Sequence, residues 1–367
     1  MATPRPRVAA RATTRPRAAD PAAGAAGRSV ATVTAGGTEP RAAVPAVVAP
    51  IADAAGPHVA GLVAAVESRL REIAGPGGEA LDLAGTAAVA AGGKRLRPLL
   101  AIVVAGAAAG DGERALAAVR AGVALELIHT ATLAHDDVLD AAPLRRGRPT
   151  AFAEHGRAAA TCLGDVLFAA AFAELATGGS TPAVQALAGA CRELAQGELL
   201  QRADAWRTDV AEARYLERCR LKTGALFAAA ATLGAQVGGV APEPYARFAT
   251  AIGVAFQLFD DVLDVVGPPE VTGKPRGTDL LDGTVTLPLL LARAQDDGLR
   301  ALDLRSLDAA SAAAACDRIA ATGATAATEH RARQLVDEAL AALPPDADAG
   351  RDRALRLIGR GVVDRRL

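Results

Sequence analysis

The sequence predicts an all-α fold. Hydrophobic residues make up 51% of the 367 positions, which is enough for a sizeable core. Aromatic residues make up only 3%, and Ala and Gly supply much of the apolar content, which favours close-packed helices over a β-rich core. No convincing stretch alternates apolar and polar residues with the period of two that a half-buried strand requires.

The chain divides into a tail and one domain. Residues 1–55 mix Ala, Pro, Arg, Thr and Gly without periodicity, and this composition predicts a disordered tail. A transit peptide is the alternative, because the tail is rich in Arg and poor in acidic residues, although Pro and Gly interrupt any amphipathic helix. Residues 56–367 show successive helical patterns and predict a single helical domain. Turn signals separate the helices at 75–78, 110–112, 178–182, 238–239 and 267–269.

Charge and cysteine content exclude several classes of function. The 40 basic and 41 acidic side chains nearly cancel, so we expect no nucleic-acid partner. No apolar run reaches the roughly 20 residues that span a bilayer, and no apolar segment typical of a secretory signal follows the N-terminal arginines. We therefore expect a cytoplasmic protein without a transmembrane segment. The four cysteines lack zinc-ligand spacing and are expected to be buried: Cys162, Cys191, Cys219 and Cys316.

Two acidic motifs share one spacing: Asp136-Asp137-x-x-Asp140 and Asp260-Asp261-x-x-Asp264. The first and last residues of each motif lie on one face of a helix, because residues four apart are about one turn apart. A single copy would fit a solvated helix end equally well, but two copies after similar apolar segments favour a binding site. Oxygen ligands without His or Cys favour Mg²⁺, which combines one or two carboxylates with phosphate oxygens. The implied ligand is a diphosphate.

Basic segments complement these motifs. Gly92-Gly93 precedes Lys94, Arg95 and Arg97, and this arrangement can bring backbone and cations to an anion, although a solvated basic turn is the alternative. A second basic segment follows the first acidic motif directly, and its guanidinium groups can fork onto phosphate oxygens. Its arginines are Arg145, Arg146 and Arg148. Three further polar residues stand in apolar helical segments, where each could also be a surface position: Lys222, Thr223 and Gln257.

In this order the motifs resemble those of the polyprenyl synthetase family, the trans-isoprenyl diphosphate synthases. The resemblance extends from about residue 60 to the C-terminus. The motifs are Gly-Gly-Lys94-Arg95-Leu-Arg97-Pro, Ile128-His129-Thr130, Asp136-Asp-Val-Leu-Asp140 with Arg145-Arg146-Gly147, Gly164-Asp165, Gly197-Glu198-Leu-Leu-Gln201, Lys222-Thr223, and Phe256-Gln257-Leu-Phe-Asp260-Asp261-Val-Leu-Asp264 with Gly273-Lys274.

The resemblance implies helices around a deep apolar cavity, with both aspartate motifs at its mouth, and a homodimer. It implies condensation of isopentenyl diphosphate with an allylic diphosphate in the presence of several Mg²⁺ ions. The implied metal ligands are Asp136, Asp140 and Asp260, with Asp137, Asp261 and Asp264 nearby or acting through water. The allylic diphosphate would be held by Arg145, Lys222 and Lys274, with Thr223 and Gln257 facing the reacting carbon. Isopentenyl diphosphate would be held by Lys94, Arg97, His129 and Arg146.

The sequence departs from the family pattern in two places. Thr284 occupies a position where the family usually has a lysine, so one cation near the diphosphate is missing. Ala141-Ala142-Pro143 follows the first aspartate motif, where polar or acidic residues are common. The second departure leaves the loop geometry open but alters none of the expected ligands.

Product length is expected to depend on the residues about one turn before Asp136, which are Ala131 and Thr132. Small residues at these positions resemble the long-chain enzymes, so we predict a hexaprenyl to decaprenyl product and an apolar tunnel that includes Ile128. A short-chain geranylgeranyl or farnesyl diphosphate synthase is the main alternative. A terpene cyclase would not need the second aspartate motif, and a catalytically silent partner subunit would be expected to have lost one.

Overall fold

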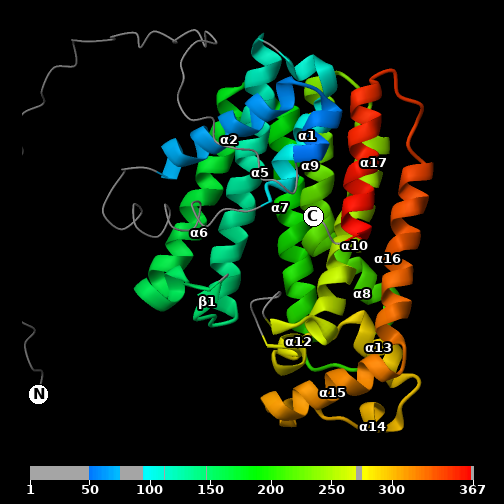
Figure 1. Cartoon of the computed structure of the whole chain (residues 1–367). Helices are drawn as coiled ribbons and strands as arrows, with labels where there is room; N and C mark the ends of the chain where they lie inside the picture. The colour runs from blue at the N-terminus through cyan, green and yellow to red at the C-terminus, as the bar shows by residue number, and fades with distance from the viewer. Residues whose placement is uncertain (1–48, 75–93, 111, 146, 270–274, 365–367) are drawn as a thin grey trace, which may run out of the picture. The chain divides into compact units, whose positions relative to one another are not determined.

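Helices form nearly all the regular structure that the computed structural model describes, namely residues 49–74, 94–110, 112–145, 147–269 and 275–364 (Figure 1). The first elements are α1 (Ala49–Ala55), α2 (His58–Ala74), α4 (Leu96–Ala105), η1 (Gly106–Gly110), α5 (Gly112–Leu139), α6 (Ala151–Thr177) and α7 (Thr181–Asp204). They are followed by α8 (Glu212–Cys219), the π-helix η2 (Arg220–Gly224), α9 (Ala225–Gly238) and α10 (Pro242–Val266). The remaining elements are α12 (Thr278–Leu281), α13 (Leu287–Arg293), α14 (Asp297–Arg300), η3 (Leu304–Ser306), α15 (Ala309–Ala321), α16 (Ala324–Ala341) and α17 (Ala349–Val363).

The only strands among the described residues are β1 (Leu144–Arg145) and β2 (Arg148–Pro149). They pair antiparallel, with Leu144 opposite Pro149. Gly147, at a φ of +74°, takes the left-handed conformation that this tight turn requires. The all-α prediction is therefore confirmed, and the short hairpin holds the loop that follows the first aspartate motif.

The core is organised around α4 and α9. Every residue of α4 except Arg97 is buried, which explains why this segment is apolar on all sides. A side chain at Gly234 of α9 would place its Cβ 2.2 Å from the carbonyl oxygen of Ala101 in α4. The two helices therefore approach almost backbone to backbone, and long side chains are excluded from the contact. A second, smaller apolar cluster joins the end of α10 to α12, α13 and α15.

Two sequence predictions fail in this part of the fold. Residues 49–55 were expected in the tail, but they form α1, whose buried Ile51, Ala52 and Ala55 pack in the core. Helix α1 lies beside α17 in Figure 1, and Arg353 donates a hydrogen bond to the carbonyl oxygen of Ala54. Its packing partner is thus at the other end of the chain, where no local pattern could reveal it. Cys162 was expected to be buried and is exposed, whereas Cys219 and Cys316 are buried as predicted.

Two helices, α5 and α6, are long and apolar enough to cross a membrane by length and composition alone. Helix α5 is mostly buried, with 67% of its apolar window inside the fold, so its hydropathy is that of a core helix. Helix α6 is only 39% buried over the same length. Much of its apolar surface is therefore uncovered in the single chain.

Candidate active site

The first aspartate motif lies at the C-terminal end of α5, beside the β1–β2 hairpin and α7. Asp137 is buried, and its Oδ1 accepts a hydrogen bond from Nε of Arg145 at 2.7 Å. Asp140 is exposed, and its Oδ1 accepts one from Arg202 of α7 at 2.6 Å. Burial raises the pKa of Asp136, and the neighbouring Glu198 and Asp140 raise it further, while Lys222 and Arg145 oppose the shift. Two arginines outside the motif, Arg145 and Arg202, thus act as counter-ions for its carboxylates.

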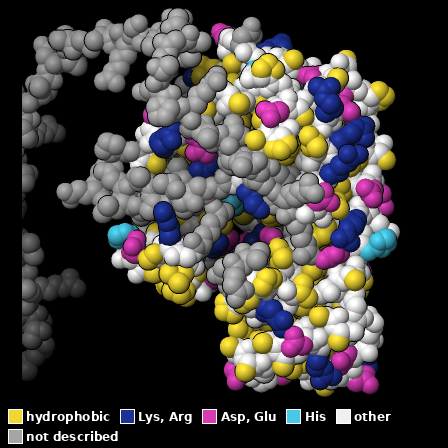
Figure 2. Space-filling view, viewed as in Figure 1, with side chains coloured by type: hydrophobic (Ala, Val, Ile, Leu, Met, Phe, Trp, Pro, Cys, Tyr) yellow, Lys and Arg dark blue, Asp and Glu magenta, His cyan; other side chains and the backbone are white. Residues whose placement is uncertain are grey.

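Helix α7 connects this motif to the middle of the site. Glu198 accepts a hydrogen bond from Nε of Arg202 at 2.7 Å and forms an ion pair with Lys222 of η2 at 2.5 Å. Burial alone would raise the pKa of Glu198, but Lys222 and Arg202 together hold it below its ordinary value. Lys222 also donates to the side-chain oxygen of Gln201 at 3.3 Å. Acidic and basic side chains lie together in the hollow at the centre of the face shown in Figure 2.

The π-helix η2 positions Lys222 and Thr223. A Cβ at Gly197 of α7 would lie 2.5 Å from the backbone nitrogen of Lys222, so only glycine allows this approach. On the opposite side, a Cβ at Gly253 of α10 would lie 2.8 Å from Cα of Gly224. The short π-helix is therefore held between two glycine contacts. Single π-turns inside α-helices are frequent at functional sites, because they turn side chains away from the regular helical face.

The second aspartate motif ends α10. Asp261 is 3% exposed, and its two oxygens accept hydrogen bonds from Tyr215 and Gln257. Burial raises the pKa of Asp261, an effect that these two donors oppose. Asp264 is also buried and accepts a hydrogen bond from the backbone N–H of Asp279 at 3.1 Å, whereas Asp260 is exposed. Because Gln257 also accepts from Thr223 at 2.9 Å, the second motif is connected to η2.

The basic residues at the start of α4 separate into two kinds. Arg95 is 5% exposed and pairs with Glu67 of α2 and Glu126 of α5, so it joins three helices and is part of the fold. Arg97 lies over the ring of Phe227 at 4.7 Å, and its buried Nε has no hydrogen-bond partner among the described residues. Burial lowers the pKa of Arg97, an effect that Glu126 and Asp260 oppose. Arg97 thus has hydrogen-bonding capacity left for an anion, while Lys94 is exposed.

Some predicted site residues are not tested by these contacts. Arg146 and Lys274 lie outside the described residues, as does the Gly92-Gly93 pair. His129 lies about two helical turns before Asp136 in α5 and is partly buried. Thr284 is partly buried, and its backbone N–H donates to the carbonyl oxygen of Asp279 at 2.8 Å.

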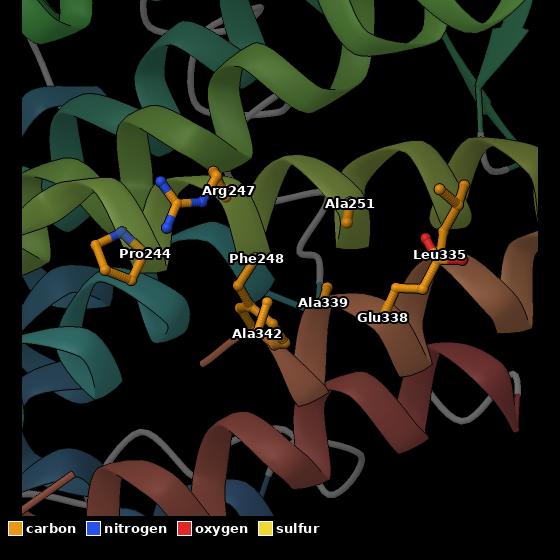
Figure 3. Close-up of a pocket in the computed structure, with 8 residues that line it drawn as sticks. All are labelled: Pro244, Arg247, Phe248, Ala251, Leu335, Glu338, Ala339 and Ala342. Atoms are coloured by element: carbon orange, nitrogen blue, oxygen red, sulfur yellow. The ribbon is translucent and has the colours of Figure 1, made fainter. Parts of the chain in front are cut away.

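The chain-length residues lie in the core of α5. Ala131 and Ile128 are each 0% exposed, and Thr132 is partly exposed and donates to the carbonyl oxygen of His129. The tunnel predicted beside them is therefore not open at Ala131 or Ile128 in this structure. A groove with a volume of 220 Å³ does lie between α10 and α16 (Figure 3). It is lined by Pro244, Arg247, Phe248, Ala251, Leu335, Glu338, Ala339 and Ala342, none of which belongs to the aspartate motifs.

The described residues fit a divalent cation that arrives with its phosphate ligand. No three His, Cys, Asp or Glu side chains within the described ranges converge to hold a metal ion by themselves. The available donors are carboxylate oxygens, which suit Mg²⁺, and Mg²⁺ normally takes its remaining ligands from substrate phosphates and water. The unpartnered Nε of Arg97 fits an anion in the same region. A diphosphate would therefore complete the metal site.

Comparison with known proteins agrees with this geometry. The family model described as polyprenyl synthetase matches residues 79–319, which is well over half of the chain. The chain belongs to the polyprenyl synthetase family. It is a prenyltransferase with the isoprenoid synthase fold, as the sequence resemblance implied.

Relatives within the polyprenyl synthetase family differ in product length. The chain is 44% identical over 239 residues to heptaprenyl diphosphate synthase component 2 of Geobacillus stearothermophilus, covering 63% of this chain and 72% of the relative. It is 40% identical over 212 residues to a geranylgeranyl diphosphate synthase of Methanosarcina mazei, covering 56% of this chain and 64% of the relative. The matched part thus spans less than two thirds of the second relative.

Solved structures cover more of the chain. A polyprenyl synthase from Caulobacter crescentus, complexed with calcium and isoprenyl diphosphate, matches with a TM-score of 0.76 and 36% identity. The match covers 88% of this chain and 97% of that structure. A geranylgeranyl pyrophosphate synthase from Lactobacillus brevis matches with a TM-score of 0.74 and 27% identity, over 83% and 97% of the two chains. A member of this family therefore binds a divalent cation together with an isoprenyl diphosphate.

Three residues of the site were not singled out as ligands from the sequence. Arg202 and Glu198 join the two halves of the site, and Glu198 belongs to the Gly-Glu-Leu-Leu-Gln motif that carries part of the resemblance. That motif could have identified Glu198. Tyr215, which contacts Asp261, lies outside every motif that carries the family resemblance.

Proposed function

We propose that the chain condenses isopentenyl diphosphate with an allylic diphosphate, using Mg²⁺, to give a long-chain all-trans polyprenyl diphosphate. The observation that carries the proposal is the continuous series of contacts from Asp140 through α7 and η2 to Asp261. These contacts link the two aspartate motifs and support a single shared site. Lys222 and Thr223 lie between the motifs, where an allylic diphosphate bound to both would have to lie.

The reaction begins when the allylic carbon–oxygen bond breaks and negative charge accumulates on the departing diphosphate. Mg²⁺ held by Asp136, Asp140 and Asp260 would supply positive charge for this anion. Arg145 and Lys222 are placed to stabilise the same anion, since they already neutralise carboxylates of the site. The charge that they stabilise is larger in the transition state than in the substrate, so their interactions accelerate the bond-breaking step.

The carbon cation is then attacked by the double bond of isopentenyl diphosphate. Thr223 and Gln257 present side-chain oxygens beside Lys222 and can stabilise a cation in this position. Arg97 would hold the second diphosphate through its free hydrogen-bonding capacity. Water must be excluded because it would quench the cation, and the apolar residues of α4, α5 and α9 beneath the site serve this purpose. The released diphosphate can accept the final proton.

A direct assay tests this function. Purified protein is incubated with Mg²⁺, radiolabelled isopentenyl diphosphate and each allylic primer in turn, and the products are separated by chromatography. Incorporation by the chain alone supports a complete synthase. Failure of every primer, with incorporation only after a second protein is added, would instead identify a partner-dependent subunit.

Long-chain synthesis is supported by the small side chain at Ala131 and by relatives that make heptaprenyl, octaprenyl and nonaprenyl products. A geranylgeranyl product is the second candidate, because a geranylgeranyl synthase is about as similar. Ala131→Phe should shorten the product, since the larger ring would block any tunnel that opens beneath Asp136 as the chain grows. Ala354 of α17 is equally buried, in a helix that contributes no residue to the proposed site, so Ala354→Phe is a control for overpacking. Unchanged product length in Ala131→Phe would contradict the tunnel assignment.

We also propose that the protein is a homodimer whose interface includes α6. This helix is apolar but mostly uncovered, and it exposes Val166 at 39%. Leu199 of α7 is 70% exposed. Light scattering after size-exclusion chromatography measures the mass. Val166→Glu should give monomers because it places a charge in the interface, whereas Leu116→Glu, at an exposed position at the start of α5, should not. A monomeric unmodified chain would contradict the proposal.

A further inference from the structure

Tyr215 connects the core to the second aspartate motif. The side chain lies in α8 and is 0% exposed, and its hydroxyl donates to Oδ2 of Asp261 at 2.5 Å. Oδ1 of Asp261 accepts from Nε2 of Gln257 at 2.8 Å, and Oε1 of Gln257 accepts from the hydroxyl of Thr223 at 2.9 Å. Three hydrogen bonds therefore lead in sequence from a buried phenol to a side chain beside Lys222.

These contacts fix the orientation of each group in turn. A carboxylate can rotate about its bond to Cβ, but Asp261 has one donor on each oxygen and is held in one plane. Since Asp261 can only accept when ionised, Gln257 must turn its NH₂ group toward it. The carbonyl oxygen of Gln257 then faces Thr223. The direction of the Gln257 amide is therefore determined from within the core.

Tyr215 is itself held rigidly. The guanidinium of Arg218 lies 5.0 Å from the centre of the Tyr215 ring, and Arg218 donates to the carbonyl oxygen of Val285 at 2.6 Å. Arg218 is 4% exposed, so the contact is shielded from water. The ring is thus held between Arg218, which is itself fixed by Val285, and Asp261 of α10, and its hydroxyl has little freedom to leave Asp261.

We propose that Tyr215 is a positioning residue for the second aspartate motif, which it keeps ready to receive Mg²⁺ with a diphosphate. This inference rests on the proposed function and extends it to a residue that touches neither substrate. Tyr215 acts through Asp261, whose orientation it sets, and through Gln257, whose side-chain oxygen it thereby directs toward Thr223. Groups that orient metal-site carboxylates typically change metal affinity or activity by about 10- to 100-fold when removed.

The chain contains a matched control, because it has two tyrosines. Tyr245 is 5% exposed and donates its hydroxyl to Oδ2 of Asp346 at 2.9 Å, in a cluster with Arg351 that contains neither aspartate motif. Tyr215→Phe and Tyr245→Phe each remove one hydroxyl from a tyrosine–aspartate contact and keep the ring. They differ in whether the aspartate belongs to the proposed active site.

The first measurement does not depend on activity. Thermal unfolding is followed while Mg²⁺ is titrated in the presence of inorganic diphosphate, and the Mg²⁺ concentration that gives half of the maximal stabilisation is recorded. Both variants should unfold at somewhat lower temperature than the unmodified protein in the absence of Mg²⁺. Tyr215→Phe should raise the half-maximal Mg²⁺ concentration about 10-fold. Tyr245→Phe should leave it unchanged.

Kinetics provide the second readout. Tyr215→Phe should lower kcat by about 10- to 100-fold, while the KM for isopentenyl diphosphate stays within about twofold, since Arg97 lies outside the hydrogen-bonded series. An equal Mg²⁺ response in both tyrosine variants would overturn the proposal, because Tyr215 would then have only a structural role. If the unmodified protein consumes no isopentenyl diphosphate, the proposed function fails, but the Mg²⁺ titration still tests the positioning role.

A second variant covers the case in which Tyr215→Phe does not fold. Gln257→Leu breaks the series between Asp261 and Thr223 and leaves the Tyr215 side chain unchanged. It should raise the half-maximal Mg²⁺ concentration in the same direction. Where both variants fold, the effect of the double variant should be smaller than the sum of the two single effects, since both act through Asp261. No Mg²⁺ shift in Gln257→Leu, or fully additive shifts in the double variant, would contradict the proposal.

Discussion

Gly197→Ala should damage the active site although the residue touches no substrate. Gly197 lies in α7, where η2 passes with its backbone against the helix. An added Cβ would lie 2.5 Å from the nitrogen of Lys222, whereas ordinary contacts begin at 3.4 Å. The backbone of η2 would therefore have to retreat by about 0.9 Å, which is the difference between these two distances. Lys222 and Thr223 would move with it.

The expected size of the effect follows from this displacement. Ala in place of Gly favours a helix interior by about 1 kcal/mol, but overpacking costs about 1–3 kcal/mol. The variant should therefore be destabilised by no more than about 2 kcal/mol and should still fold. A shift of about 1 Å in groups that position a substrate can reduce activity about 100-fold. We expect kcat/KM for the allylic substrate to fall by about 10- to 100-fold.

Gly189 of the same helix is a matched control, because a Cβ added there would meet nothing within 4 Å. Gly189→Ala should keep full activity and gain about 1 kcal/mol of stability. Initial rates with radiolabelled isopentenyl diphosphate and thermal unfolding by circular dichroism measure both quantities. Activity of Gly197→Ala within about twofold of the unmodified enzyme would refute the reasoning, as would equal losses in the two variants.

Two further predictions concern stability and substrate binding. Arg351 donates to both oxygens of Asp346, whose side chain is 5% exposed, and holds the pKa of that carboxyl below its usual range. The stabilisation is therefore present above the ordinary pKa of about 3.9 and is lost as pH falls through the lowered value. The free energy of unfolding of Asp346→Asn, measured by urea denaturation near neutral pH, should therefore be about 3 kcal/mol lower than that of the unmodified protein. This difference should shrink toward about pH 3, where the carboxyl becomes protonated. A difference independent of pH would contradict the reasoning. Arg97→Met removes a buried nitrogen that has no hydrogen-bond partner among the described residues, so the free energy of unfolding should stay constant or rise by about 1 kcal/mol. In steady-state assays, the KM for isopentenyl diphosphate should rise about 10- to 100-fold. A large loss of stability with a normal KM would assign Arg97 to the fold instead.

The aspartate motifs could be predicted from the sequence because their geometry is local. Residues four apart on a helix share a face wherever the helix lies, so the spacing of Asp136 and Asp140 already defines a pair of carboxylates. The order of the apolar segments likewise predicted helices, since amphipathic and buried helices leave a pattern in the residues themselves. In both cases the relevant contacts are a few positions apart along the chain.

The roles of neighbouring residues could not be predicted where a distant partner decides them. Arg95 and Arg97 occur in one basic segment, yet Arg95 is paired with Glu67 and Glu126, while Arg97 keeps an unpartnered Nε. The contact between Arg202 and Asp140 spans 62 positions. Such pairs depend on how helices pack, and no local spacing encodes them.

The counter-ions of the site suggest which half rearranges when substrate binds. In the first motif, Arg202 and Asp140 are 41% and 40% exposed, and pairs of this kind are worth about 1 kcal/mol or less. A diphosphate carrying Mg²⁺ can therefore exchange these partners at little cost, taking the arginine for its oxygens and the carboxylate for its metal. In the second motif, Asp261 and its contact with Tyr215 are buried, and breaking that contact would leave a carboxylate without one of its donors. The first motif should therefore change its ion pairs on binding, while the second acts as the fixed reference against which the allylic carbon is placed.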